Sequence, residues 1–184
     1  SNGAQTIIDQ FITTGERNAA FGSQSLDANS TGSNNTAVGH GALSANTTAN
    51  NNVAVGKDAL LLNTTGAANT ALGYTAFYNN TEADGGVAIG NRALDANTTG
   101  DYNVGIGHDA LGANTTGTQN NAVGATAGDA ITTGLYNNLL GYAAGGAVTT
   151  ANGNNAMGHT ALNSTTNGVN TGFGKLANVT IVEN

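Results

Sequence analysis

The chain contains no cysteine and no proline among its 184 residues. Without cysteine it forms no disulfide, has no thiolate nucleophile and offers no zinc site that needs a Cys ligand. The lack of proline favours a fold in which nearly every backbone N–H joins a hydrogen-bonded ladder, because proline has no N–H to donate. Both absences point away from thiol chemistry and towards regular backbone pairing.

Charged and aromatic residues are also scarce. Charged residues make up 8% of the chain, and only four of them are Lys or Arg, which gives a net charge of −7. Such a chain has no basic footprint for nucleic acid. Aromatic residues make up 5%, and the apolar content is mostly Ala, Leu, Val and Ile, so we expect a narrow core of small side chains. No apolar run approaches the roughly 18 residues that a membrane-spanning helix needs, and we expect no membrane insertion.

What the chain has instead is an internal repeat. A glycine recurs nine times at steps of 17 residues, and a tenth follows after 16: Gly22, Gly39, Gly56, Gly73, Gly90, Gly107, Gly124, Gly141, Gly158 and Gly174. The residue before each glycine is always apolar: Phe21, Val38, Val55, Leu72, Ile89, Ile106, Val123, Leu140, Met157 and Phe173. One coil reads Asn-Thr-Ala-Val-Gly-x-x-Ala-Leu-x-Ala-Asn-Thr-Thr-Gly-x-x.

A coil of 17 residues with two apolar stretches and two bends rich in Gly and Asn is too short for a helix–turn–helix repeat. It fits two short strands and two turns, with coils stacked about 4.8 Å apart. We therefore predict an all-β fold, a parallel β-solenoid or β-roll of about ten coils over 18–174. Stacked Asn side chains are expected to form ladders along its axis.

The repeat varies in the middle and is incomplete at both ends. Gly128 and Gly145 replace the usual Leu, while Ile131 and Val148 replace the Asn three residues later, so we expect these two apolar side chains to stack on each other. Residues 1–17 read as a lead-in with a partial coil, since 12–15 match the variant pattern. Residues 175–184 read as a partial coil or strand, strand-like at 179–182 and without a polar cap, which predicts that the chain continues in a longer protein.

Each strand is expected to be apolar on both of its faces. Successive side chains of a strand point to opposite sides, so Ala54 and Val55 face opposite ways, although both are apolar. A monomeric solenoid buries only one of these faces, and the other would remain an apolar stripe on the surface. We therefore expect an oligomer in which Ala fills the interior and the stripe meets other copies, with the opposite assignment of faces left open. The stripe comprises Val38, Val55, Leu72, Ile89, Ile106, Val123, Leu140 and Met157.

The repeat at 35–43, its echoes through 170–177 and the Asn-Thr-Thr-Gly bends resemble the repeats of trimeric surface fibres, which occur in phage tail fibres and related bacterial fibres. They are similar to the Ala-Ile-Gly repeats of trimeric autotransporter adhesin heads, which are left-handed parallel β-rolls, although the coil here is longer. The resemblance implies an elongated homotrimer in an extracellular, cell-surface or virion fibre. It also implies attachment to a host, prey or surface, with a cell-surface glycan or protein receptor as partner.

The sequence contains no pattern that predicts an enzyme, a metal site or a cofactor. No nucleophile motif, paired-carboxylate pattern or acidic calcium-binding repeat is present. His40, His108 and His159 all follow the repeat glycine, in a column that also holds Lys, Tyr and Asn. That variability indicates an exposed position; the alternative is a metal site formed where three copies bring imidazoles together.

Two candidate binding surfaces remain. Tyr74, Tyr78, Arg92 and Tyr142 are aromatic and cationic residues on a surface poor in both, and such residues are enriched at binding hot spots. The alternative function is ice binding by a Thr ladder formed by Thr47, Thr64, Thr81, Thr98, Thr115, Thr132, Thr149 and Thr166. Against ice binding, glycine follows this column in most coils, which indicates a bend rather than a flat face.

Overall fold

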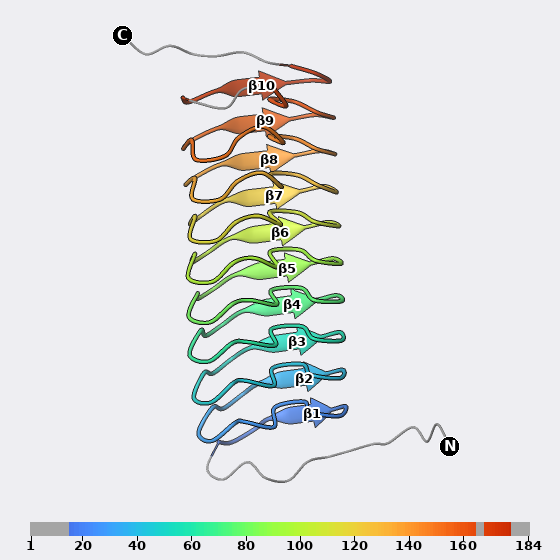
Figure 1. The fold of residues 1–184 in the computed structure, drawn as a ribbon, viewed down its shortest axis with the longest axis vertical. Coiled ribbons are helices and arrows are strands. Elements are labelled where there is room, and N and C mark those ends of the chain that lie inside the picture. The colour runs from blue at the N-terminus through green and yellow to red at the C-terminus, as the bar shows by residue number, and fades with distance from the viewer. Residues whose placement is uncertain (1–14, 165–167, 178–184) are drawn as a thin grey trace, which may run out of the picture.

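The computed structural model describes residues 15–164 and 168–177. The chain forms one parallel sheet whose ten strands are stacked in sequence order, as a β-solenoid of about nine turns (Figure 1). The strands are β1 (Ala19–Phe21), β2 (Thr36–Val38), β3 (Val53–Val55), β4 (Thr70–Leu72), β5 (Val87–Ile89), β6 (Val104–Ile106), β7 (Asn121–Val123), β8 (Asn138–Leu140), β9 (Asn155–Met157) and β10 (Thr171–Phe173). The predicted all-β parallel solenoid is therefore confirmed. No helix capable of spanning a membrane occurs in the described part of the chain.

Neighbouring strands pair at equivalent positions of the repeat. Between β3 and β4, for example, Val53 lies opposite Thr70, Ala54 opposite Ala71 and Val55 opposite Leu72. Because each coil repeats the same chain path, every sequence column becomes a file of residues along the rod. The predicted partial coil before Gly15 and the strand-like segment 179–182 lie outside the described residues.

The glycine column marks the place where the chain leaves each strand. Gly39 has a φ of 133°, and a Cβ added to it would lie 2.5 Å from the carbonyl oxygen of Gly56 in the next coil. A residue with a side chain is excluded by this backbone conformation and by this close approach of two coils. The recurrence of glycine is thus a consequence of coil stacking.

The second apolar stretch of each coil is a series of turns rather than the second strand that we predicted. In the third coil, Asp58 and Leu60 have positive φ values of 57° and 51°, which interrupt the pleat of a strand. The amide of Ala59 donates to the Gly56 carbonyl within the coil at 3.4 Å, while the Leu60 amide donates to Ala76 in the next coil at 3.0 Å. Coils therefore remain hydrogen-bonded to one another on this side without forming a sheet.

The interior is thin and is filled by small residues and leucine. The central Ala of nearly every strand and the Ala and Leu that follow the glycine are buried, as Ala54, Ala59 and Leu60 illustrate. In the two variant coils, Ile131 and Val148 are fully buried at equivalent positions of neighbouring coils. Leu139 completes this region: its side chain occupies the space in which a Cβ on Gly128 or Gly145 would have to lie.

Two buried asparagine files run along the axis, as the repeat predicts. In the file that precedes the strands, the backbone N–H of Asn52 donates to Oδ1 of Asn35 at 2.9 Å. In the file at the opposite bend, Nδ2 of Asn63 donates to Oδ1 of Asn46 at 3.0 Å. The second ladder ends at Asn114, whose buried Oδ1 receives no hydrogen bond, because Ile131 takes the next place and has no donor.

Candidate functional site

Each three-residue strand points its middle residue into the rod and its two flanking residues outward. The outward face of the sheet therefore consists of two files. The leading file contains the first residue of each strand: Ala19, Thr36, Val53, Thr70, Val87, Val104, Asn121, Asn138, Asn155 and Thr171. The apolar file contains the third: Phe21, Val38, Val55, Leu72, Ile89, Ile106, Val123, Leu140, Met157 and Phe173.

The apolar file is exposed along most of the rod and half-exposed at Val55, Ile89 and Ile106. The exposed fraction is 46% for Leu72, 50% for Met157 and 66% for Phe173, whereas the alanines between the two files are buried in β2 and later strands. All eight residues of the stripe that the sequence predicts lie in this file. The sequence left open which column faces the interior, and in the structure the Ala column does so. An apolar file that extends through ten coils is an extended patch of the kind that marks an interaction surface.

Neither outward file contains a charged residue. The leading file changes character along the rod, from Thr and Val in β2–β6 to Asn in β7–β9. Nδ2 of Asn121 donates to Oδ1 of Asn138 at 2.9 Å, and Nδ2 of Asn138 donates to Oδ1 of Asn155 at 3.1 Å. Beside this outward Asn ladder lies a groove of about 360 Å³, which is lined by the ladder and by Val123, Leu139, Leu140, Ala156, Met157 and Phe173.

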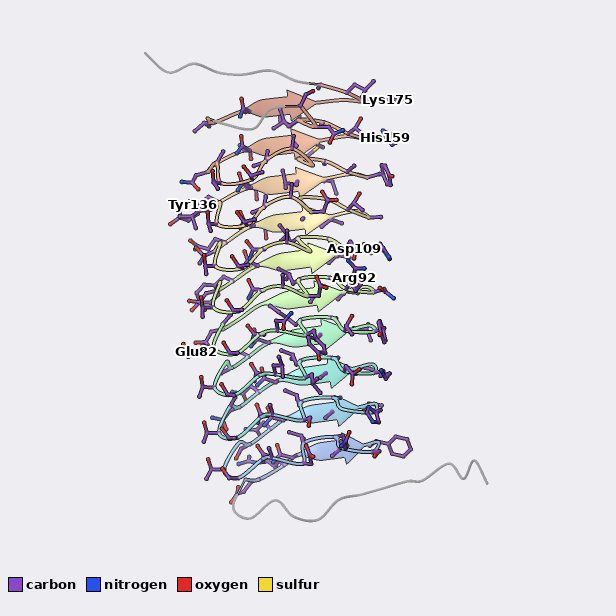
Figure 2. The ribbon with its side chains drawn as sticks, viewed as in Figure 1. Glu82, Arg92, Asp109, Tyr136, His159 and Lys175 are labelled. Atoms are coloured by element: carbon purple, nitrogen blue, oxygen red, sulfur yellow. The ribbon has the colours of Figure 1, made fainter. Side chains whose placement is uncertain are left out.

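The predicted aromatic and cationic residues lie on another part of the surface, where the chain turns after the glycine. The Lys57 ammonium lies over the Tyr74 ring, 5.3 Å from its centroid. The amide of Arg92 donates to the Tyr74 carbonyl of the preceding coil, so these two residues are neighbours. Figure 2 shows Arg92 along one edge of the rod and Tyr136 along the other. Tyr142 is not part of this group, because it lies four coils from Tyr74 and stacks on His159 with 5.1 Å between ring centroids.

Arg92 and Lys57, beside Tyr74 on this edge, are both paired with carboxylates. Nε of Arg92 lies 3.0 Å from Oδ1 of Asp109 and 3.6 Å from Oδ2 of Asp95. Nζ of Lys57 lies 2.8 Å from Oδ2 of Asp58. This hydrogen bond lowers the pKa of Asp58 and raises that of Lys57. The edge is therefore a network of exposed ion pairs around Tyr74 rather than a cluster of unpaired cations.

The histidines do not come together within the chain. His40 lies 3.5 Å from Asp58 and His108 lies 3.0 Å from Asp109, in each case through Nδ1 and a carboxylate oxygen. Among the described residues, no group of three potential metal ligands is close enough to hold an ion. Histidines brought together by three copies remain an untested alternative.

Burial alters the acidity of two aspartates beside this edge. Desolvation raises the pKa of Asp95, and the nearby Arg92 opposes this effect only in part. Desolvation is also the main cause of the raised pKa of Asp129, with Asp109 contributing by charge repulsion. Carboxylates lose hydration when neighbouring coils cover them, which favours the protonated form.

The hydroxyls of the Thr ladder are engaged by the rod itself. Oγ1 of Thr64 donates to the carbonyl of Thr81 at 3.0 Å, and Oγ1 of Thr98 donates to that of Thr115 at 3.0 Å. The same inter-coil bond recurs from Thr47 to Thr132. Thr166, the last predicted member, lies outside the described residues. A threonine hydroxyl has a single donor, and these hydroxyls already use it in a hydrogen bond to the next coil.

Sequence reasoning missed the outward Asn ladder. Its signal is the doubled asparagine in three successive coils, at 120–121, 137–138 and 154–155. The first member of each pair is buried and the second points outward. This difference depends on the strand beginning at the second Asn, which the sequence alone does not show.

Comparison with protein-family models, curated proteins and solved structures finds no match for this chain.

Proposed function

We propose that this chain is a structural and adhesive segment of an extracellular fibre, assembled as a homotrimer through the outward face of its sheet. The observation that supports this proposal most is the apolar file, which is apolar in all ten coils and lies outside the core. These side chains are not covered by other parts of the chain, and nothing within the protomer requires them to be apolar. Apolar residues at all ten positions therefore support a partner that covers them.

The distribution of charge supports another copy of the chain as the partner. With a net charge of −7, two copies repel each other over most orientations. The outward face is neutral, whereas the edge at which the chain turns after the glycine carries the ion pairs around Asp58 and Asp109. The resemblance to trimeric fibre repeats supports the number three, the extracellular location and the role in attachment.

A charge placed in the apolar file tests the interface. Ile89→Asp should leave the protomer folded, because Ile89 points outward, but should prevent assembly by burying unpaired carboxylates at the symmetric contact. Asn91→Asp, two residues further on at an exposed position, is the matched control and should assemble like the wild type. Sedimentation velocity measures both. Equal sedimentation of the two variants would contradict the proposed interface.

The attachment role is tested separately with correctly assembled protein. Tyr74→Ala combined with Tyr78→Ala should reduce binding in a whole-cell or glycan-array assay, because aromatic faces suit sugar rings and protein receptors. Tyr136→Ala removes an exposed tyrosine from the opposite edge (Figure 2) and serves as the control. Undiminished binding by the double variant would mean that this edge is scaffold only.

A further inference from the structure

The outward Asn ladder is a polar island on an otherwise apolar or hydroxyl-bearing face. Asn121, Asn138 and Asn155 occupy three consecutive levels of the leading file, where the other coils have Thr, Val or, in β1, Ala. They adjoin an exposed part of the apolar file, at Met157 and Phe173. Any partner that covers the apolar file in this region must also cover the ladder.

The ladder leaves hydrogen-bonding capacity unused within the protomer. An asparagine amide has two N–H donors and an oxygen with two lone pairs. Asn121 and Asn138 each use one N–H to reach the next coil, and Asn138 and Asn155 each accept one such bond. Nδ2 of Asn155 also donates one N–H to the Gly153 carbonyl at 3.5 Å. The remaining donors and lone pairs are exposed to water, and a covering surface has to replace that water with polar partners.

Resting on the proposed self-association, we propose that the outward Asn ladder fixes the register and direction of the assembled copies. When copies run parallel and in register, the three Asn levels of one copy meet the three Asn levels of the next, and amide pairs amide. A shift by one coil places an Asn level against Val104 or Thr171. Reversal of one rod places the ladder against β2–β4, which present Thr and Val.

A second copy is the occupant that the face itself favours. The face bears no charge on a chain with a net charge of −7, so it is the surface on which like-charged copies meet with least repulsion. The apolar file alone does not define a register, because it is apolar at every level and tolerates sliding by whole coils. A buried asparagine is a known device for fixing register between helices, at some cost in stability.

Register is measured by placing one spin label on each chain. The chain has no cysteine, so Ser23→Cys and Asn91→Cys each create one labelling site, at exposed positions in the first and fifth coils. Pulsed electron paramagnetic resonance then gives the distances between labels in the assembly. Parallel copies in register should give one distance that is the same for both sites. Antiparallel copies would separate the Ser23 labels by about 43 Å more along the rod than in-register copies, from nine coil spacings.

When the ladder is replaced, the copies should still assemble but without one fixed register, so the labels should no longer give a single distance. Asn121→Val, Asn138→Val and Asn155→Val together introduce the residue found at the same file position in β3, β5 and β6. We expect an unchanged oligomer mass and several label distances. The control, Thr36→Val with Thr70→Val, removes hydroxyls from the same file and should keep the single distance.

Moving the ladder to other strands tests whether it sets the register, independently of local changes around β7–β9. Adding Thr36→Asn, Val53→Asn and Thr70→Asn to the triple valine variant moves the ladder to β2–β4 and should restore the single distance. If the triple variant assembles with the same single distance as the wild type, the ladder does not set register, and the proposed interface still stands. If the wild type is monomeric, both proposals are wrong.

Discussion

Each residue in a coil lies above its equivalent in the coil before, so the environment of one side chain is repeated along a column. The glycine at the end of each strand is the strictest case, because its positive φ and the carbonyl oxygen of the next coil both exclude a Cβ. The columns on the outside are freer: the position after the glycine accepts His, Lys, Tyr and Asn. The constraint on each position thus follows from what the next coil places against it.

Gly141→Ala should be strongly destabilising. Gly141 has a φ of 133°, and a Cβ there would lie 2.5 Å from the Gly158 carbonyl oxygen. Backbone strain and overlap of this kind cost about 1–3 kcal/mol or more. Gly112→Ala, at a position that holds Asp, Ser, Leu or Tyr in other coils, should have little effect. Thermal unfolding followed by circular dichroism compares the two, and similar Tm values would contradict this account of the glycine column.

Asp129→Asn should stabilise the rod at neutral pH. Because burial raises the pKa of Asp129, the folded state binds its proton more readily than the unfolded chain does. The penalty for ionising Asp129 is therefore present at neutral pH and disappears as the pH falls through its raised pKa towards the unfolded value of about 3.9. A Tm increase of about 1–2 °C is expected at pH 7.

The increase should vanish at acidic pH, where the wild-type side chain is already protonated. Asp27→Asn, at the equivalent but exposed position of the first coil, should change Tm by less. A stabilisation of Asp129→Asn that is the same at both pH values would contradict the assigned cause.

At the scale of the element, some parts of a coil can be predicted from the sequence and others cannot. The spacing of glycine predicts the solenoid, and the Ala and Asn columns predict its thin core and ladders. The stretch after the glycine resembles a strand because Ala and Leu recur there. The identity of these side chains does not reveal that Leu60 and Asp58 have positive φ. Gly128 and Gly145 occupy the Leu column with positive φ, and only the structure shows that Leu139, from the strand side, fills their space.

Leu139→Ala should therefore destabilise the rod more than a surface truncation of the same size. The side chain of Leu139 is buried between the coils that lack their usual Leu, so its loss leaves a cavity that costs about 2–5 kcal/mol. Leu62→Ala, at an exposed leucine, is the control. Chemical denaturation measures both. Equal midpoints would show that Ile131 and Val148 alone fill the variant coils.

The Thr ladder should act as a structural element and not as an ice-binding face. Because Thr98 and Thr115 donate their hydroxyl protons to the next coil, Thr98→Val with Thr115→Val should lower stability by about 0.5–1.5 kcal/mol per lost hydrogen bond. The wild-type protein should show no thermal hysteresis and should leave ice crystals unshaped. Faceted ice that disappears in the double variant would instead favour ice binding.

At the scale of the whole molecule, the rod has two unlike surfaces. One is neutral and largely apolar over all ten strands, and the other carries exposed aromatic residues and ion pairs around Tyr74 and Arg92. A rod that associates through the first surface, as proposed, leaves the second exposed to its surroundings. The proposed division of roles accounts for a constant apolar file beside a variable column after the glycine.

The molar mass of the wild-type protein in solution is the most direct test of this division. Size exclusion with light scattering at micromolar concentration should give three times the chain mass of 18.1 kDa, with an elongated shape by small-angle scattering. Association is expected because the apolar file is otherwise exposed to water along the rod. A mass near 18.1 kDa would contradict the central claim that the outward face of the sheet is an interface between copies of this chain.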